Sequence, residues 1–296
     1  MSARWALLGF GEVGHVLAAP DVLGPLEPAV VLPGTRAVSA ATLARLEQAG
    51  IEPLRDIAAL GSFDVVLSVV TPASAADVAR DAGPHLQRGA LYVDANSISG
   101  DTAREIAEIV ADSSASFVDA VFMGAVPLLR RAVPMYLSGP GAWAFASHAS
   151  DAGLVPRVVS ERPGDASDLK MLWSVMSKGA IGLVAETLTA AERLGLTASV
   201  LELLAEQFGR TGSREMVLRM LESTARSGPR RLDEMAAARE TLARAGVPAT
   251  MVDAASAWIE LLSERGSAAD APDVETAIAA AASDVAASAP LEQVVD

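Results

Sequence analysis

The chain has 296 residues, of which 51% are hydrophobic and 20% are charged, with no cysteine and a formal net charge of −14. This is the composition of a globular chain long enough for two domains, and the lack of cysteine excludes disulfides, thiol catalysis and thiolate metal sites. The negative charge argues against nucleic acid and anionic membrane as partners, and no apolar run reaches the length of a membrane span. The simplest interpretation is a bacterial-type cytoplasmic enzyme.

The most informative pattern lies at the start, where the apolar run Trp5–Leu8 leads into Gly9-x-Gly11-x-x-Gly14 and then into a helical pattern. A strand before and a helix after are the usual setting of the dinucleotide-binding fingerprint. Gly9 suits the tight turn, Gly11 lets the backbone approach a pyrophosphate, and Gly14 lets the helix pack on the strand. The alternative is a glycine-rich turn that binds nothing. The predicted cofactor contacts of this turn are Gly9, Phe10, Gly11, Glu12, Val13 and Gly14.

Short β-like runs alternate with helical patterns over the first half of the chain, as in a parallel α/β sheet. The predicted strands are Trp5–Leu8, Ala29–Leu32, Val65–Val70, Leu91–Asp94, Phe117–Ala120 and Pro134–Ser138. The predicted helices between them are Ala41–Ala49, Ser74–Ala82 and Asp101–Val110. From about residue 160 the pattern is helical, and it begins with one long helix over Asp165–Leu194.

This order of elements predicts an α/β chain with an N-terminal Rossmann-type doubly wound parallel sheet, followed by an all-helical C-terminal domain. We expect the dinucleotide-binding domain over residues 1–162 and a helical substrate or dimerisation domain over residues 163–265. An Ala/Asp-rich tail, helical or partly disordered, follows over residues 266–296.

The loop after the second predicted strand favours NADP over NAD. NAD-binding folds place an acidic residue there, about 20 residues past the glycines, to hold the ribose 2′-hydroxyl. This chain has Thr35 and Arg36 instead, and a guanidinium suits a 2′-phosphate. The alternative is that both are ordinary loop residues.

The lysines are unusually few. The 23 basic residues comprise 21 arginines and two lysines, Lys170 and Lys178, which stand in one short helical segment. An ammonium group can be tuned to lose its proton, whereas a guanidinium effectively cannot. At helical spacing, Lys170 shares one face with Ser174, Ser177 and Ile181. This polar stripe has two interpretations. It is part of a site, or Lys170 is a surface lysine whose aliphatic stem lies along an apolar surface.

Several of these segments together resemble the β-hydroxyacid dehydrogenase superfamily, which includes 3-hydroxyisobutyrate dehydrogenases, 6-phosphogluconate dehydrogenases and imine reductases. The resemblance rests on the glycine turn, Tyr92–Asp101, Asp119–Val126 and the helix of Lys170, and it extends over roughly residues 5–265. Within the superfamily, the chain most resembles a branch of phosphogluconate-dehydrogenase-like proteins. The phrases similar to that branch are Asp119–Gly124, Ser167–Met171, Ser177–Gly179 and Arg230–Met235.

The resemblance implies a catalytic lysine at Lys170. The superfamily has an asparagine four residues later, where this chain has Ser174, and a carboxylate-binding serine where this chain has Met123 followed by Gly124. The loss of that hydroxyl makes a simple 3-hydroxy acid a poor candidate substrate. Ligands of such sheets sit at the carboxyl ends of the strands. The loop of Asn96 and Ser97 is therefore expected at the nicotinamide end, and Val70 and Thr71 against the cofactor.

The sequence thus predicts an NADP-dependent oxidoreductase that transfers hydride between nicotinamide and a carbonyl or alcohol carbon of a small polar substrate. Lys170 is the expected general acid–base, and Ser174 and Asn96 are expected to orient the substrate. The predicted substrate contacts are Ser97, Met123, Gly124, Ser174, Lys178 and Arg231. The alternatives are an imine reductase and a non-catalytic NADP-binding protein.

Two expectations concern partners and metals. The superfamily buries the long helix against a second subunit, so we expect a homodimer. The three histidines follow no ligand spacing and the carboxylates form no metal motif, so we expect no metal site. Arg230 and Arg231 have a second interpretation, the solvated start of an amphipathic helix.

Overall fold

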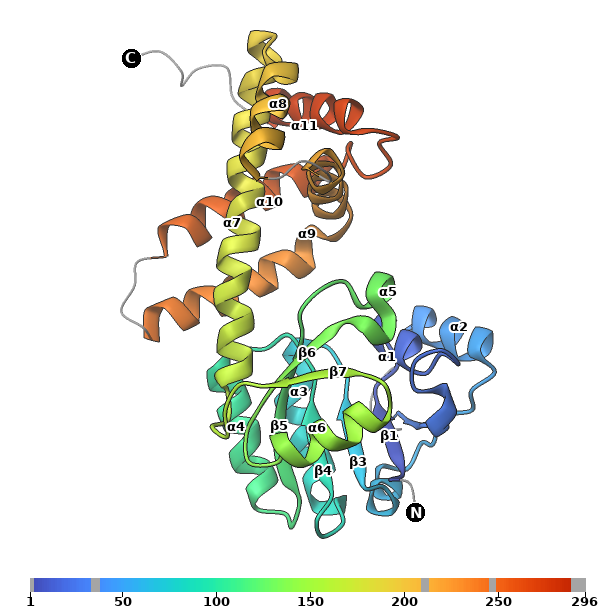
Figure 1. The fold of residues 1–296 in the computed structure, drawn as a ribbon. Helices are drawn as coiled ribbons and strands as arrows, with labels where there is room; N and C mark the ends of the chain where they lie inside the picture. The colour runs from blue at the N-terminus through green and yellow to red at the C-terminus, as the bar shows by residue number, and fades with distance from the viewer. Residues whose placement is uncertain (1–2, 33–37, 209–212, 245–248, 289–296) are drawn as a thin grey trace. The chain divides into compact units, whose positions relative to one another are not determined.

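A computed structural model describes residues 3–32, 38–208, 213–244 and 249–288 (Figure 1). The chain divides into two compact units, Met1–Lys170 and Met171–Asp296. The division falls inside a helix, so the first turn of that helix belongs to the first unit. In the part of the chain that the structure describes, no helix is both long enough and apolar enough to cross a bilayer.

The first unit is built on a seven-stranded sheet in the order β2-β1-β3-β4-β5-β6-β7 (Figure 1). The strands are β1 (Trp5–Leu8), β2 (Ala29–Val31), β3 (Val65–Ser68), β4 (Leu91–Asp94), β5 (Ser116–Phe122), β6 (Pro134–Ser138) and β7 (Val155–Val158). Strands β1 to β5 are parallel, as predicted. Strand β6 runs antiparallel to β5, and β7 runs parallel to β6. The predicted doubly wound sheet is confirmed, with a mixed edge in place of an all-parallel one.

The antiparallel pair has a simple cause. A parallel connection needs a crossover of a dozen or more residues, usually a helix. Between β5 and β6 the chain has only residues 123–133, which hold the four-residue helix α5 (Val126–Leu129) and a short turn. The segment therefore returns as a long hairpin, and β6 pairs in the opposite direction.

Helices cover both faces of the sheet. They are α1 (Glu12–Leu17), α2 (Ala40–Ala49), α3 (Ala75–Ala82), α4 (Gly100–Ala111), α5 and α6 (Ala142–Asp151). Short 3-10 turns lie between them: η1 (Gly24–Leu26), η2 (Ile57–Ser62), η3 (Pro72–Ser74), η4 (Gly83–His85) and η5 (Arg130–Ala132).

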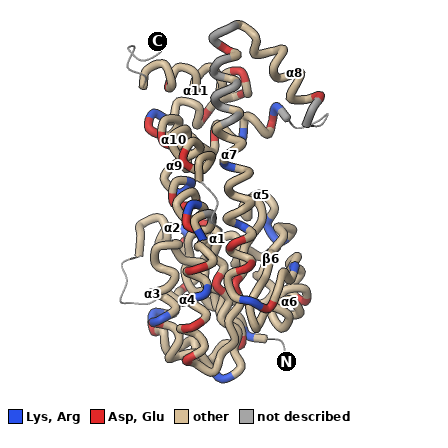
Figure 2. The backbone as a smooth tube through the Cα atoms, turned by 90° about the vertical axis from the view of Figure 1, so that its left-hand side faces the viewer, with Lys and Arg blue, Asp and Glu red and all other residues tan. Residues whose placement is uncertain are grey.

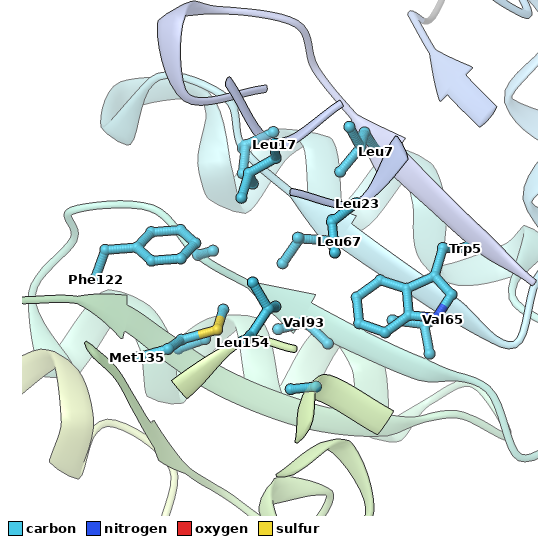
Figure 3. Packing of buried hydrophobic residues seen from close by; sticks show 14 of the residues in the cluster. Trp5, Leu7, Leu17, Leu23, Val65, Leu67, Val93, Phe122, Met135 and Leu154 are labelled. Carbon is cyan, nitrogen blue, oxygen red and sulfur yellow. The ribbon is translucent and has the colours of Figure 1, made fainter. Parts of the chain in front are cut away.

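Successive residues of a strand point to opposite faces of a sheet. Leu7, Leu67 and Val93 pack on one face, in a core that also takes Leu17 of α1 and Phe145 of α6 (Figure 3). Their strand neighbours point the other way, into a second core with α3 and α4, and these are Ala6, Leu8, Val66 and Tyr92. Because both faces are buried, the central strands are continuous apolar runs.

Strand β7 and helix α6 were not predicted, and neither was the four-residue helix α5. Strand β7 carries Pro156, and proline is tolerated in a sheet only where its missing N–H is not needed, as on an edge strand. Val155 and Arg157 of this strand are exposed. Because one face of this edge strand is exposed and the other is only half-buried, its sequence lacks a strong alternation of apolar and polar residues. Helix α6 is built largely from small residues, which favour no period strongly.

The second unit is helical. Its helices are the greater part of α7 (Asp165–Leu194), α8 (Thr197–Phe208), α9 (Ser213–Arg244), α10 (Thr250–Arg265) and α11 (Val274–Ser288). Helix α9 is bent at Ser227, whose φ of −128° is non-helical, and Pro229 follows. At Gly228 a Cβ would lie 2.1 Å from the side chain of Ser263 on α10, so α9 and α10 pack in close contact there. Helix α11 lies in the Ala/Asp-rich tail, and residues 289–296 lie outside the described residues.

Candidate active site

The glycine turn between β1 and α1 has the geometry that its spacing predicts. Gly9 has a φ of +102°, and a Cβ there would meet the carbonyl oxygen of Val69 at 2.8 Å. A Cβ on Gly14 would meet the carbonyl oxygen of Gly9 at 2.9 Å. A Cβ on Gly11 would meet no atom of the described residues within 4 Å. The chain's own packing therefore accounts for Gly9 and Gly14, whereas the space at Gly11 is what a dinucleotide pyrophosphate requires.

The segment after β3 lies against this turn. The Cγ1 atom of Val70 lies 2.8 Å from the position that a Cβ on Gly9 would occupy. Thr71 follows, with its hydroxyl 2.7 Å from that of Ser74. The structure thus brings Val70 beside the glycine turn. Thr35 and Arg36, the predicted determinants of cofactor choice, lie outside the described residues.

The loop after β4 is organised by a buried carboxylate. Asp94 accepts hydrogen bonds from the backbone N–H of Asn96 at 3.1 Å and from its Nδ2 at 2.8 Å. The same Nδ2 donates to Ser68 Oγ at 3.2 Å, while Asn96 Oδ1 is buried and accepts no hydrogen bond from the residues that the structure describes. Burial raises the pKa of Asp94 to about 7, against the opposing effect of the bonds from Asn96.

Lys170 reaches this loop. Its Nζ donates a hydrogen bond of 2.6 Å to Ser97 Oγ, the hydroxyl next to Asn96 in the chain. Lys170 is half-buried. Two predicted site residues that are 73 positions apart thus form one pair, and a third, Asn96, adjoins it in the chain.

A second buried carboxylate fixes the start of α7. Asp119 of β5 accepts hydrogen bonds from the Ser167 backbone N–H at 2.9 Å and hydroxyl at 2.7 Å, and from Ser138 Oγ at 3.0 Å. Ser138 Oγ in turn accepts from the backbone N–H of Ala166 at 2.9 Å. Burial raises the pKa of Asp119, and these hydrogen bonds oppose the rise. The anchor lies within one turn of Lys170 and so positions it.

A third contact holds the same turn of α7. Arg104 of α4 donates to Asp168 at 3.3 Å from both terminal nitrogens. A Cβ on Gly100, at the start of α4, would lie 2.2 Å from the Asp168 carboxylate, so only glycine allows this approach. These contacts were not predicted. Asp119 and Ser167 stand in segments that carry the family resemblance, but their pairing across 48 positions leaves no local sequence pattern.

Within the helical unit, predicted residues of α7 and α9 form a cluster. Lys178 Nζ lies 2.6 Å from Glu234 Oε2 and donates to the buried Ser174 Oγ at 3.4 Å. Burial lowers the pKa of Lys178, although Glu234 acts to raise it. Arg231 lies one helical turn from Glu234. Glu234 itself was not predicted as a site residue.

Met123 and Gly124 follow β5. Met123 donates its backbone N–H to the carbonyl of Pro134 at 2.8 Å, and Gly124 has a φ of +138°. Among the described residues, no three His, Asp or Glu side chains gather as a metal site would require.

Comparison with known proteins gives one family domain and several close relatives. Residues 191–262 match a domain of unknown function, DUF1932. An uncharacterized 28.5 kDa protein of Methanothermus fervidus is 30% identical over 208 residues, which are 70% of this chain and 78% of that protein. A solved conserved protein of unknown function, described as structurally similar to 3-hydroxyacid dehydrogenases, is 34% identical with a TM-score of 0.69. The match covers 89% of this chain and 99% of that one.

The fold is shared with more distant proteins. The 3-hydroxyisobutyrate dehydrogenase of Mycobacterium tuberculosis has a TM-score of 0.75 at 17% identity, over 94% of this chain and 99% of that one. A reductive aminase of Aspergillus terreus, solved with NADPH, has a TM-score of 0.54 at 19% identity, over 88% and 93%.

The buried Asp94 predicts a pH-dependent stability. The folded protein holds this proton up to a pH of about 7, whereas an unfolded aspartate loses it near pH 4. Asp94 therefore makes the free energy of unfolding fall as pH rises between these values. Asp94→Asn removes the titration. Relative to wild type, the variant should gain more than about 1.4 kcal/mol, the equivalent of one pKa unit, between pH 5 and pH 8.

Urea unfolding at the two pH values measures this gain. Asp112→Asn, at an exposed position just after α4, is the control and should follow wild type at both. A difference between Asp94→Asn and wild type that stays constant from pH 5 to pH 8 would contradict the assignment.

Proposed function

We propose a specific redox function from one premise: this chain belongs to the β-hydroxyacid dehydrogenase superfamily. It is an oxidoreductase of the β-hydroxyacid dehydrogenase type. The proposal is that it uses NADP and transfers hydride to or from the carbonyl or alcohol carbon of a small polar substrate, with Lys170 as general acid–base. The observation that carries the proposal is the 2.6 Å pair of Lys170 and Ser97.

Two features of the first unit fit a nicotinamide dinucleotide. The free space at Gly11 suits a pyrophosphate, and Gly9, Phe10, Glu12, Val13 and Gly14 complete the turn around it. The buried Oδ1 of Asn96 has no donor in the described part of the chain and would accept a hydrogen bond from a ligand. When bound, the nicotinamide supplies or accepts the hydride.

The protein's part in the reaction is to move a proton and hold the substrate. In reduction, the Lys170 ammonium donates a proton to the oxygen on the reacting carbon. In oxidation, the neutral amine takes the hydroxyl proton. Ser97 accepts a hydrogen bond from Nζ and so keeps the amine in one position. We assign Asn96 and Ser174 to the orientation of the substrate.

Two alternatives come from different classes of protein. An imine reductase has support from the fold shared with the reductive aminase, but superfamily members of that type usually carry another residue at the position of Lys170. A non-catalytic NADP-binding protein would have no use for a lysine paired in the loop next to Asn96. Measuring NADPH consumption with ketoacids, semialdehydes and cyclic imines separates the three.

Lys170→Ala should lower kcat by about 10²–10⁴-fold on the best substrate of that panel, the usual contribution of a positioned acid or base. Affinity for NADPH should change little, because the glycine turn is unaltered. Lys170→Arg should not restore the rate, because a guanidinium is a poor proton donor. Arg80→Ala, which removes exposed ion pairs to Asp77 and Glu105, is the control. Lys170→Ala within a few-fold of wild type would refute the assignment.

For the cofactor, we propose that Arg36 pairs with the 2′-phosphate of NADPH and that Thr35 lies beside it. Arg36→Ala should weaken NADPH binding by about 1.5–3 kcal/mol, the range for a hydrogen bond to a charged group, and leave NADH binding unchanged. Arg88→Ala, at an exposed position before the amino end of β4, is the matched control. Fluorescence titration gives both affinities. Equal affinities of wild type for NADPH and NADH would exclude the preference.

We also propose that the protein is a homodimer through α7. Three large side chains of this helix are exposed, Leu172 by 50%, Trp173 by 58% and Met176 by 68%. Exposed apolar side chains that gather on one helix mark an interaction surface. Light scattering should give twice the chain mass. Trp173→Asp should shift the protein to monomer, and Trp143→Asp, at an exposed site on α6, should not. A monomeric wild type would contradict the proposal.

A further inference from the structure

Four charged side chains gather in the helical unit, one from α7 and three from α9. Lys178 Nζ lies 2.6 Å from Glu234 Oε2, and Arg230 pairs with the other oxygen of the same carboxylate. The charges of Glu234 and Arg230 also act on Arg231, since Glu234 raises the pKa of its guanidinium and Arg230 lowers it. In this group, three cations face one carboxylate. The cluster of Lys178, Arg230, Arg231 and Glu234 therefore carries a surplus of two positive charges.

The other arginines of α9 are balanced differently. Helix α9 carries both arginines and acidic residues, which Figure 2 marks in blue and red. Each of four arginines has its own acidic partner at the surface, namely Arg214, Arg219, Arg226 and Arg239. The surplus thus distinguishes the group around Lys178 from these four arginines, in a chain whose net charge is −14.

The cluster is also partly buried. The side chains of Lys178 and Glu234 are exposed by only 16% and 5%. Cations in such surroundings are poorly solvated, and a buried charge is tolerated when a counter-charge meets it. The Arg230 side chain is 63% exposed and is solvated by water, so the cations that need compensation are Lys178 and Arg231, which share the one carboxylate of Glu234. What the site lacks is a second anion.

Unused hydrogen-bond donors point the same way. Arg231 Nε is buried and has no hydrogen-bond partner among the described side chains and backbone, while its Nη2 donates to Ser223 Oγ at 2.5 Å. Buried donors are almost always paired. Ser174 Oγ is buried beside Lys178 and has its own hydrogen to donate. A guanidinium edge, an ammonium and a hydroxyl together match the several lone pairs of an oxyanion.

We propose that Lys178, Arg231 and Ser174 form an oxyanion-binding site in the helical unit, which takes a carboxylate or phosphate group. The proposal rests on the proposed function in one respect, that the molecule carrying this anion is the substrate. Glu234 is a positioning residue, because it holds Lys178 by an ion pair, whereas its own negative charge would repel a bound anion. Arg230, more exposed, holds the other oxygen of Glu234.

Binding is tested on the full chain without any turnover. Isothermal titration calorimetry at constant ionic strength, with NADP⁺ at saturation, uses inorganic phosphate and acetate as probes. At least one probe should bind wild type, and Arg231→Gln should weaken it about tenfold or more, which corresponds to the loss of a hydrogen bond to a charged group. Arg226→Gln, one helical turn earlier and paired at the surface with Glu222 and Asp270, should bind like wild type.

Ser174→Ala provides a second variant that makes a smaller change to the fold, and it should weaken the same probe. The probe that responds tells the two anion sources apart. If neither probe binds, or if Arg231→Gln and Ser174→Ala both bind as wild type does, the site is refuted.

Turnover tests whether the anion belongs to the substrate. Two aldehydes that differ only in the anion, 4-oxobutanoate and its methyl ester, are compared by NADPH oxidation. The acid should have the lower KM, and Arg231→Gln should raise that KM about tenfold or more with little change in kcat or in the KM of the ester. Reduction of both aldehydes by NADPH with no effect of Arg231→Gln on the KM of the acid would overturn the inference. If neither aldehyde is reduced and probe binding is intact, the result counts against the proposed function alone.

Discussion

The carboxylate of Asp119 is the contact on which the arrangement of the first unit depends. It accepts three hydrogen bonds, from the Ser167 N–H and hydroxyl and from Ser138 Oγ, and so ties the first turn of α7 to the middle of the sheet. Breaking such a buried network leaves a carboxylate without compensation, which is costly. Lys170 stands one turn along the helix, and its position beside Ser97 follows from that anchor.

The two groups of candidate residues differ in character. The loop after β4 is a network of hydrogen bonds around Asp94, in which Asn96 donates from its backbone N–H and from Nδ2. Such a network holds its side chains in one arrangement, as proton transfer requires. The cluster of Lys178, Arg230, Arg231 and Glu234 is ionic and has donors to spare. One group suits chemistry and the other suits the capture of charge.

Much of this could be predicted from the sequence, for physical reasons. Strands buried on both faces, such as β1 and β4, are continuous apolar runs and can be recognised as strands from their composition. The glycine spacing after β1 predicted the turn that follows it. The edge strand β7 was missed because Pro156 and its exposed side remove the pattern. Lys170 stood out because lysine is rare in this chain. Its support by Asp119 and Ser167, and the place of Glu234 beside Lys178, depend on tertiary contacts without local periodicity.

The way α7 begins has a consequence for how such proteins can be recombined. The sheet ends with β7, yet Ala166, Ser167 and Asp168 belong to the first unit through their bonds to Ser138, Asp119 and Arg104. In a chimera joined just after β7, these three residues would come from the protein that supplies the helices, and they would have to bond to the sheet of another protein. A junction after Lys170 keeps these three residues in the same protein as the sheet to which they bond. Exchange of helical units among homologues, in the laboratory or in evolution, is therefore compatible with the anchor only when the crossover falls within α7.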